Sequence, residues 1–349
     1  MNTRQVGIKQ VAHAAGVSVG TVSNVINRPE SVSEATRARV LSAIQQLGYV
    51  RSESARQLRA GRSRIIALLV LDMANPFFVD VASGAERAAR EAGLGVMLCN
   101  SAQSPSEEAE YLSLFAEQRV RGVLVTPADS GGENLVGFRR HGIPFVFVDR
   151  FDSDSERCSV SVDDVTGGEL AVAHLLDQGH SDIAYVSGPM QLTQCRDRHT
   201  GALNALRGAG TGATLRQVET PRLDVAAGRD AGARLLGMSP RPSGVFCAND
   251  LLALGVLQAL YGAGVAVPGE VALVGYDDIE FAAAAAVPLT SVRQPAFRMG
   301  RAAADLLIEE TAEPGEPGES GEAVGGHEHQ QIVLQPELVV RSSTMSVQG

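Results

Sequence analysis

The apolar positions of the first fifty residues have the spacing of short amphipathic helices. They recur three and four apart over residues 8–15, and Gly16-Val17-Ser18 then breaks the pattern with a helix-ending glycine and an N-cap residue. A second helix is predicted over residues 19–27, and a third follows from Ser33 to Gly48. Three short helices around a glycine-containing turn predict an all-α helix-turn-helix domain.

From Ile65 the pattern changes to continuous apolar runs that alternate with amphipathic segments. The runs IIALLVL, GVMLC, GVLVT and PFVFVD form a first series. A second series begins near Ser159 with SVSV and continues through DIAYVSG, TLRQVE, SGVFCA and VALVGYD. Strands buried on both faces and joined by helices indicate doubly wound parallel sheets. Two series of similar size predict a two-lobed α/β body with a cleft between the lobes.

Composition divides the chain further. We assign residues 1–50 to the helix-turn-helix domain, 51–64 to a linker that could become a hinge helix, and 65–349 to the body. Residues 311–331 are rich in Pro, Gly and Glu without periodicity, so we expect a disordered insertion before the last strand pair, IVLQPELVV.

The charge is unevenly distributed along the 349 residues. Residues 1–64 carry ten basic and three acidic side chains, a balance of +7, although the whole chain has a net charge of −10. The remaining 285 residues therefore carry −17. A basic head on an acidic body predicts a polyanionic partner for the head, whereas charge alone leaves a merely solvated basic face equally open.

Several classes of protein are disfavoured. The N-terminal segment lacks the apolar core of a secretory signal, and no apolar run approaches the roughly 20 residues of a membrane span. The four cysteines form no C-x-x-C pair, so we expect small core residues in a reducing compartment rather than disulfides or zinc ligands. We therefore expect a cytoplasmic protein without membrane contact.

Motifs for catalysis or cofactors are also weak. Residues 16–20, GVSVG, match a hydrolase nucleophile elbow, but a helix rather than a strand precedes them. The loop at 208–212 follows a helix and precedes a strand, the reverse of a dinucleotide fingerprint. His327-Glu328-His329 lacks zincin spacing and falls in the expected insertion, which leaves adventitious metal binding as a minor alternative. We expect no enzyme, no cofactor and no metal site.

An ordered set of segments resembles the lac repressor and gal repressor family of bacterial transcription regulators. It comprises IKQVAHAAGVSVGTVSNVINRPESVSEATRARVLSAIQQLGYV, SARQLRAGRS, NPFF, VDR, IAYVSGP, CANDLLALG, VGYDDI and PLTSVRQP. The resemblance implies an allosteric repressor that binds palindromic double-stranded DNA as a homodimer or a tetramer. It also implies a body built like periplasmic sugar-binding proteins, with a small sugar-like effector in the cleft. Because the tail RSSTMSVQG has no heptads, a tetrameric coiled coil is not expected.

The same resemblance implies that each lobe contains two separate parts of the chain. We expect lobe one to comprise about 65–160 and 293–325, and lobe two about 161–292 and 326–349, so that the last strands return to lobe two.

The resemblance places base reading at Val19, Gly20 and Asn24. Val19 offers contact with a thymine methyl, Gly20 offers no side chain, and Asn24 can pair with adenine. Small hydroxyl and amide groups would position phosphates. The alternative is N-capping alone, and for Ser18 and Ser33 we expect both roles. The phosphate set is Ser18, Thr21, Ser23, Asn27, Ser33 and Thr36. In the linker, Leu58 stands where the family inserts a leucine into the minor groove, with Ala55 one turn earlier on the same face.

The resemblance also supplies candidates for effector binding, which lie at predicted strand ends or at the start of the next helix, where doubly wound sheets bind ligands. These are Asp149, Arg198, Asn249 and Asp277. Phe77 or Phe78 could stack on a sugar ring, and simple packing of one or both in the lobe is an equally favoured alternative. A periplasmic-type solute-binding protein is the rival function for the body, and the basic head and the missing signal argue against it.

Overall fold

The computed structural model describes residues 6–49, 63–128, 132–151, 156–210, 212–312 and 327–345. It contains two compact units, Met1–Ser63 and Arg64–Gly349. We call the first unit the head and the second the body.

The head is built from helices, as the apolar spacing predicted. Its elements are α1 (Ile8–Ala15), α2 (Val19–Asn27), the 3-10 helix η1 (Pro29–Ser31) and α3 (Glu34–Leu47). Gly16 ends α1 with a left-handed φ of 64°, and the Ser18 hydroxyl caps α2 by accepting a hydrogen bond of 3.0 Å from the Thr21 amide. A small core that includes Val11, Val22 and Val40 holds the three helices together.

The body contains two six-stranded sheets. The first has the order β11-β5-β4-β3-β1-β2, and all its paired strands are parallel. Its strands are β1 (Ile65–Val70), β2 (Gly95–Asn100), β3 (Val123–Val125), β4 (Phe145–Val148), β5 (Ser159–Val162) and β11 (Gln331–Leu334). The second has the order β12-β10-β9-β8-β6-β7, in which only β12 is antiparallel to its neighbour. Its strands are β6 (Asp182–Ser187), β7 (Thr214–Glu219), β8 (Gly244–Cys247), β9 (Ala272–Asp277), β10 (Thr290–Arg293) and β12 (Glu337–Val339).

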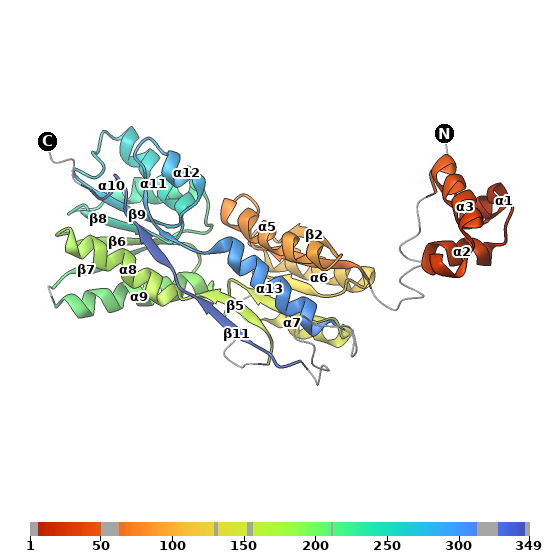
Figure 1. Cartoon of the computed structure of the whole chain (residues 1–349). Helices are drawn as coiled ribbons and strands as arrows, with labels where there is room; N and C mark the ends of the chain where they lie inside the picture. Colours follow the sequence, from red (N-terminus) through yellow and green to blue (C-terminus); the bar gives the residue numbers. More distant parts are fainter. Residues whose placement is uncertain are drawn as a thin grey trace. The chain divides into compact units, whose positions relative to one another are not determined.

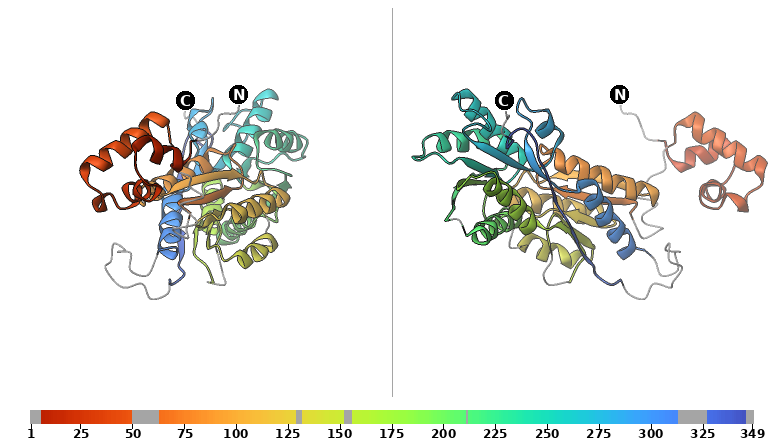
Figure 2. Two further views of the ribbon diagram at one scale, coloured as in Figure 1. Left: turned by 90° about the vertical axis from the view of Figure 1, so that its right-hand side faces the viewer. Right: turned by 60° about the vertical axis from the view of Figure 1, so that its left-hand side comes forward.

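Helices cover both faces of each sheet (Figures 1 and 2). In the first lobe α5 and α13 pack together on one face, and α6 and α7 enclose a separate core on the other. In the second lobe α8 pairs with α9 on one face and α10 with α11 on the other. The body helices are α5 (Pro76–Glu91), α6 (Pro105–Gln118), α7 (Glu133–Phe138), η2 (Arg139–His141), α8 (Asp164–Asp177), α9 (Thr193–Ala209), α10 (Val225–Leu236), α11 (Asp250–Gly262), α12 (Glu280–Ala284) and α13 (Ala296–Glu310). Among the helices that the structure describes, none has the length and apolar character to span a membrane.

Glycines allow α5 and α13 to pack very closely. A Cβ on Gly84 would lie 2.0 Å from the Phe297 carbonyl oxygen, and a Cβ on Gly300 would lie 1.8 Å from that of Val81. No larger residue fits between two backbones at this separation. The α5–α13 pair therefore fixes the chain segment that returns to the first lobe.

The sequence analysis assigned two strands to the wrong lobe. The SVSV segment, expected to open the second series, is β5 of the first sheet, and β11, expected in the second lobe, pairs with β5 in parallel. Only β12 joins the second sheet, where it runs antiparallel to β10. The chain thus passes between the lobes after β5, after β10 and after β11, and Pro336 in the third passage ends one strand before the other begins. The core of the expected insertion, residues 313–326, lies outside the described residues.

Candidate functional site

The first turn of α2 presents an exposed surface on the head. Val19 is 41 % exposed, and Gly20 and Asn24 are also exposed. Val22 and Val25 of the same helix are buried, so the three positions predicted to read bases lie on the face turned away from the core. The structure therefore leaves all three accessible to a nucleic-acid groove.

The hydroxyl and amide residues around this face are engaged locally. Ser18 and Thr21 hydroxyls lie 2.9 Å apart, and the Asn27 amide donates to the Ser23 carbonyl oxygen at 2.8 Å. The Ser33 hydroxyl donates to that of Thr36 at 3.0 Å. The Ser18–Thr21 and Ser33–Thr36 bonds orient side chains at the N-termini of α2 and α3, where backbone amides favour anions, whereas the Asn27–Ser23 bond lies at the C-terminal end of α2. Ala55 and Leu58 lie outside the described residues.

Gly20 has no evident structural reason to be glycine. A Cβ built on it meets only the Ser18 hydroxyl oxygen, at an ordinary 3.6 Å. Because glycine costs a helix about 1 kcal/mol relative to alanine, the head loses stability at this position without any packing gain. Packing within the described head therefore gives no reason for a glycine at this position.

The body contains a pocket that both lobes line. The pocket is partly open to solvent and lies between side chains from β-strand ends, helix starts and the passages between the lobes. Its lining residues are Leu71, Asn75, Phe77, Phe78, Asp149, Gln194, Arg198, Leu223, Asn249, Asp277 and Gln294. All six effector-binding residues predicted from the sequence are among them.

Two aspartates face this pocket from opposite sheets. Asp149 follows β4 of the first sheet and Asp277 ends β9 of the second, and their φ values of 59° and 104° are in a region that non-glycine residues rarely adopt. Such strain persists only where surrounding structure enforces it, and it concentrates at functional sites. Both carboxylates are more than nine-tenths buried.

Burial governs the protonation of these aspartates. The pKa of Asp149 is raised to about 7, first by loss of solvent and next by the negative charge of Asp164, against the opposing charge of Arg198. The same loss of solvent raises the pKa of Asp277 to about 6, opposed by Arg198 and by the amides of Asn75 and Gln294. The Oδ1 atom of Asp149 has no hydrogen-bond partner among the described residues, which leaves an acceptor for a ligand hydroxyl.

Arg198 carries positive charge into the same pocket. Its Nε donates to Asp164 Oδ1 at 2.8 Å, and its guanidinium lies 3.7 Å from the centroid of the Tyr276 ring. Burial is the largest single influence on its pKa and lowers it, but the nearby Asp164, Tyr276, Asp277 and Asp149 together outweigh burial, so the net shift of the pKa is upward. A guanidinium has five N–H donors, so the Asp164 bond does not exhaust its capacity. Arg198 is thus both a ligand-facing group and part of a buried ion pair.

The remaining predicted residues complete a wall. Phe77 and Phe78 are both nearly fully buried, and their rings meet edge to face with centroids 4.9 Å apart. They belong to the hydrophobic core and line the pocket, so the two alternatives weighed for them are compatible. Asn249 caps α11 through its Oδ1 and donates from Nδ2 to the Leu223 carbonyl oxygen at 3.1 Å.

Three amides in the pocket were missed by the sequence analysis. Asn75 and Gln294 donate to the two oxygens of Asp277 at 2.8 and 2.7 Å, and Gln194 donates to Asp149 at 2.9 Å. In the sequence, Asn75 stood out only as part of the family segment NPFF. Each is an isolated polar residue in a local sequence that gives no hint of its partner.

Known proteins show the same combination of parts. The chain is 36% identical to the ribose operon repressor of Escherichia coli strain K12, covering 96% of this chain and 99% of the relative. It is 33% identical to the HTH-type transcriptional repressor PurR of Photobacterium profundum, again covering 96% of this chain and 98% of the relative. Among solved structures, the lac repressor dimer bound to operator and an anti-inducer matches with a TM-score of 0.82, 26% identity and coverage of 98% and 100%. A complex of the transcriptional regulator CelR with cellobiose matches with a TM-score of 0.69, 32% identity and coverage of 97% and 100%.

A helix-turn-helix head and a two-lobed body with a polar pocket define a DNA-binding regulator with a ligand-binding domain. The family model for bacterial regulatory proteins of the lacI family matches residues 7–52, and that for a periplasmic binding protein-like domain matches residues 172–344. The chain belongs to the lacI family of bacterial transcriptional repressors. These relatives are regulators and not enzymes, so the hydrolase-like GVSVG segment is a coincidence within α2 and its preceding turn.

Proposed function

We propose that this repressor binds a monosaccharide in the pocket between its lobes, and that the sugar changes its affinity for a palindromic operator. The observation that carries the proposal is the pairing of two buried carboxylates, one from each lobe, with an arginine and four amides around one space. The protein would act in the cytoplasm as a homodimer.

The chemistry of the pocket suits a sugar. Carboxylates, an arginine and amides can each exchange hydrogen bonds with vicinal hydroxyls, while an apolar wall packs against the C–H face of a ring. Leu71, Leu223 and the two phenylalanines supply that wall. The relative named as a ribose operon repressor, and a ribose-bound regulator of Enterococcus faecalis at 26% identity, support this class of ligand.

The head would bind DNA through α2 in the major groove. Val19, Gly20 and Asn24 would meet base edges, and the hydroxyl and amide groups of Ser18, Thr21, Ser23, Asn27, Ser33 and Thr36 would meet phosphates. Ala55 and Leu58 of the linker would enter the minor groove at the centre of the operator. A single head of this size offers too little surface for tight specificity, so two heads would bind the two halves of the palindrome symmetrically.

Coupling between the two sites requires a modest energy. A hundredfold change in operator affinity corresponds to about 2.8 kcal/mol, because each tenfold is about 1.4 kcal/mol. Charge-assisted contacts made in only one arrangement of the lobes could supply this amount. Asp149 and Asp277 are placed for such contacts because they face one pocket from different sheets.

Calorimetry with separate aldopentoses, aldohexoses, disaccharides and nucleobases tests the ligand class. We expect a pentose or hexose to bind, and Asp277→Asn to weaken it at least about tenfold, the cost of one good charge-assisted bond. Asp80→Asn, on the exposed surface of α5, is the matched control and should bind as the parent does. If no monosaccharide binds, or if Asp277→Asn binds equally well, this ligand assignment is wrong.

Fluorescence anisotropy at fixed salt tests the DNA mode. We expect Leu58→Ala to weaken operator binding by about 1–3 kcal/mol through loss of the minor-groove wedge, with the sugar affinity unchanged. Binding to a single half-site as tight as binding to the full palindrome would contradict the dimeric mode.

A further inference from the structure

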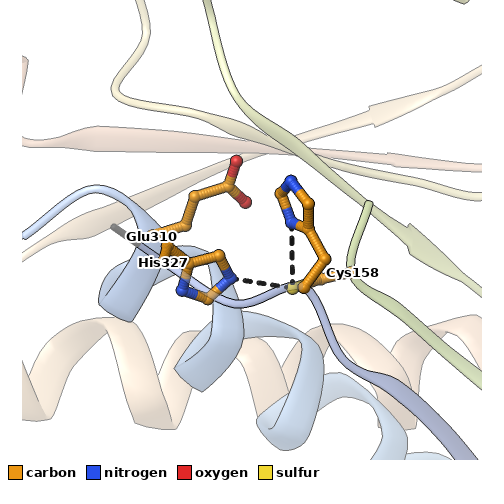
Figure 3. Close-up of side chains that lie close together, drawn as sticks. Cys158, Glu310 and His327 are labelled. Carbon is orange, nitrogen blue, oxygen red and sulfur yellow. Dashed lines mark hydrogen bonds between the residues drawn. The ribbon is translucent and has the colours of Figure 1, made fainter. Parts of the chain in front are cut away.

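Four side chains with metal-ligand chemistry converge at the base of the first lobe. Cys158 precedes β5, Glu310 ends α13, and His327 and His329 precede β11. One ligand atom from each lies within 4.8 Å of all the others. Figure 3 shows Cys158, Glu310 and His327 turned toward a common centre. Three chain segments far apart in sequence thus bring a thiol, two imidazoles and a carboxylate together.

The spacing of the ligand atoms matches a small tetrahedral ion. Cys158 Sγ lies 3.0 Å from His327 Nε2 and 3.8 Å from His329 Nδ1. Around a tetrahedral Zn²⁺ with Zn–S about 2.3 Å and Zn–N about 2.0–2.1 Å, sulfur and nitrogen lie about 3.5 Å apart. The two observed separations lie on either side of that value.

The cluster also contains polar atoms that protein groups do not satisfy. Glu310 Oε2 and His327 Nδ1 are shielded from solvent and have no hydrogen-bond partner among the described residues. A shielded carboxylate oxygen without a donor is costly, and a cation is one remedy. Cys158 itself is fully buried, so its thiol is directed at the histidines and not at solvent.

We propose that Cys158, Glu310, His327 and His329 bind one Zn²⁺ ion. Mixed thiolate, imidazole and carboxylate donors suit zinc better than the harder Mg²⁺ or Ca²⁺. Four protein ligands close the coordination shell, so the site is structural and not catalytic. No metal was expected here from the sequence because His327-Glu328-His329 lacks zincin spacing and falls in the expected insertion. The fold brings Cys158 to these histidines through the parallel pairing of β5 with β11.

The position of this site separates it from the effector pocket. Cys158 and His329 lie just before the starts of β5 and β11, whereas Asp149 and Asp277 lie at the ends of β4 and β9. Zinc would link the segment before β11 and the end of α13 to the segment before β5, at the end of the sheet where these strands begin. Its effect should therefore be on the stability of the first lobe and not on sugar binding.

Metal analysis of the untagged full-length protein tests the proposal. After reduction, removal of metal with a chelator and dialysis against Zn²⁺ alone, we expect one equivalent of zinc per chain. Co²⁺ alone should give a thiolate-to-cobalt charge-transfer band. Cys158→Ser should abolish that band. It should also weaken Zn²⁺ binding by more than about 10- to 100-fold, which is the loss expected when only an outer-shell partner of a ligand is removed.

Matched variants distinguish a built site from general thiol or imidazole binding. Cys99→Ser and His141→Ala, which lie outside the cluster, should retain the full zinc content and the cobalt band. Zn²⁺ should raise the Tm of the parent and of these controls but not that of His327→Ala/His329→Ala. Substoichiometric zinc in the parent, or equal zinc affinity in Cys158→Ser, would overturn the proposal. Circular dichroism shows whether Cys158→Ser folds, and if it does not, His329→Gln is tested in its place.

Discussion

Asn75 in the first lobe donates a hydrogen bond of 2.8 Å to Oδ2 of Asp277 in the second lobe. Asn75 is held in place because its own Oδ1 accepts from the Phe77 amide and caps α5. Both partners are buried, so the bond does not compete with water. It joins the lobes at the pocket itself, and any ligand that contacts Asp277 also acts on the contact between the lobes.

Replacing Asn75 by aspartate should open the lobes. Asn75→Asp keeps an oxygen for the α5 cap but places a carboxylate against Asp277, and like charges at this distance repel strongly in a buried site. We expect a larger radius of gyration in small-angle scattering of the ligand-free protein at pH 8. Asn75→Ser, which caps the helix without the new charge, should shift it less. Equal scattering from parent and Asn75→Asp would show that the bond does not hold the lobes together.

Arg198 should matter for stability as much as for ligand binding. Arg198→Ala leaves Asp164 buried without its cation, and breaking one side of a buried pair costs about 3–5 kcal/mol. Urea unfolding should show this loss, and Arg198→Met/Asp164→Asn should recover part of it. Arg216→Ala, whose partner Asp182 is partly exposed, should cost about 1 kcal/mol or less. Similar losses for both single variants would contradict the buried-pair interpretation.

Much of the pocket could be predicted from the sequence because its residues lie at strand ends and helix starts, which the apolar pattern identifies. Asp149 and Asp277 lie at strand ends and Asn249 at a helix start, and in parallel sheets these positions meet at one edge. Asn75, Gln194 and Gln294 could not be found in this way. Each becomes part of the site only through a partner elsewhere in the fold, as with Gln294, which lies where the chain passes between the lobes after β10.

Strand assignment failed for a related reason. The segment IVLQPELVV predicts two short strands, and the structure has β11 and β12 there. Whether a short strand joins the first or the second sheet depends on which sheet has an unpaired edge strand within reach. Here β11 pairs with β5 at the edge of the first sheet. The local pattern of apolar residues predicts that a strand forms, but not which strand it pairs with. The same pairing creates the Cys158 and histidine cluster, which the sequence therefore also concealed.

The raised pKa of Asp149 predicts how stability changes with pH. A carboxyl has a pKa near 3.9 when unfolded, and here it titrates at about 7, so the folded state holds the proton more tightly. Stability from this group is therefore fully present below about pH 4 and lost as the pH rises through 7. Asp149→Asn removes that loss because it has no carboxyl to titrate. The Tm difference between Asp149→Asn and the ligand-free parent should therefore be more positive at pH 8 than at pH 5. The Tm difference for Asp80→Asn should be flat over this range, and a flat difference for Asp149→Asn would refute the assignment.

Gly20 offers a test in which stability and DNA binding move in opposite directions. An added Cβ meets nothing closer than 3.6 Å in the head, so Gly20→Ala should stabilise α2 by up to about 1 kcal/mol through helix propensity. If a DNA base or the DNA backbone approaches Gly20 closely, the same methyl should weaken operator binding by about 1–3 kcal/mol, comparable to one lost base contact. Thermal unfolding and anisotropy at fixed salt measure the two effects. Gly208→Ala in α9, where a Cβ also meets no atom within 4 Å, should gain stability without changing operator affinity. Unchanged or stronger operator binding by Gly20→Ala would mean that the glycine is not required at the DNA surface.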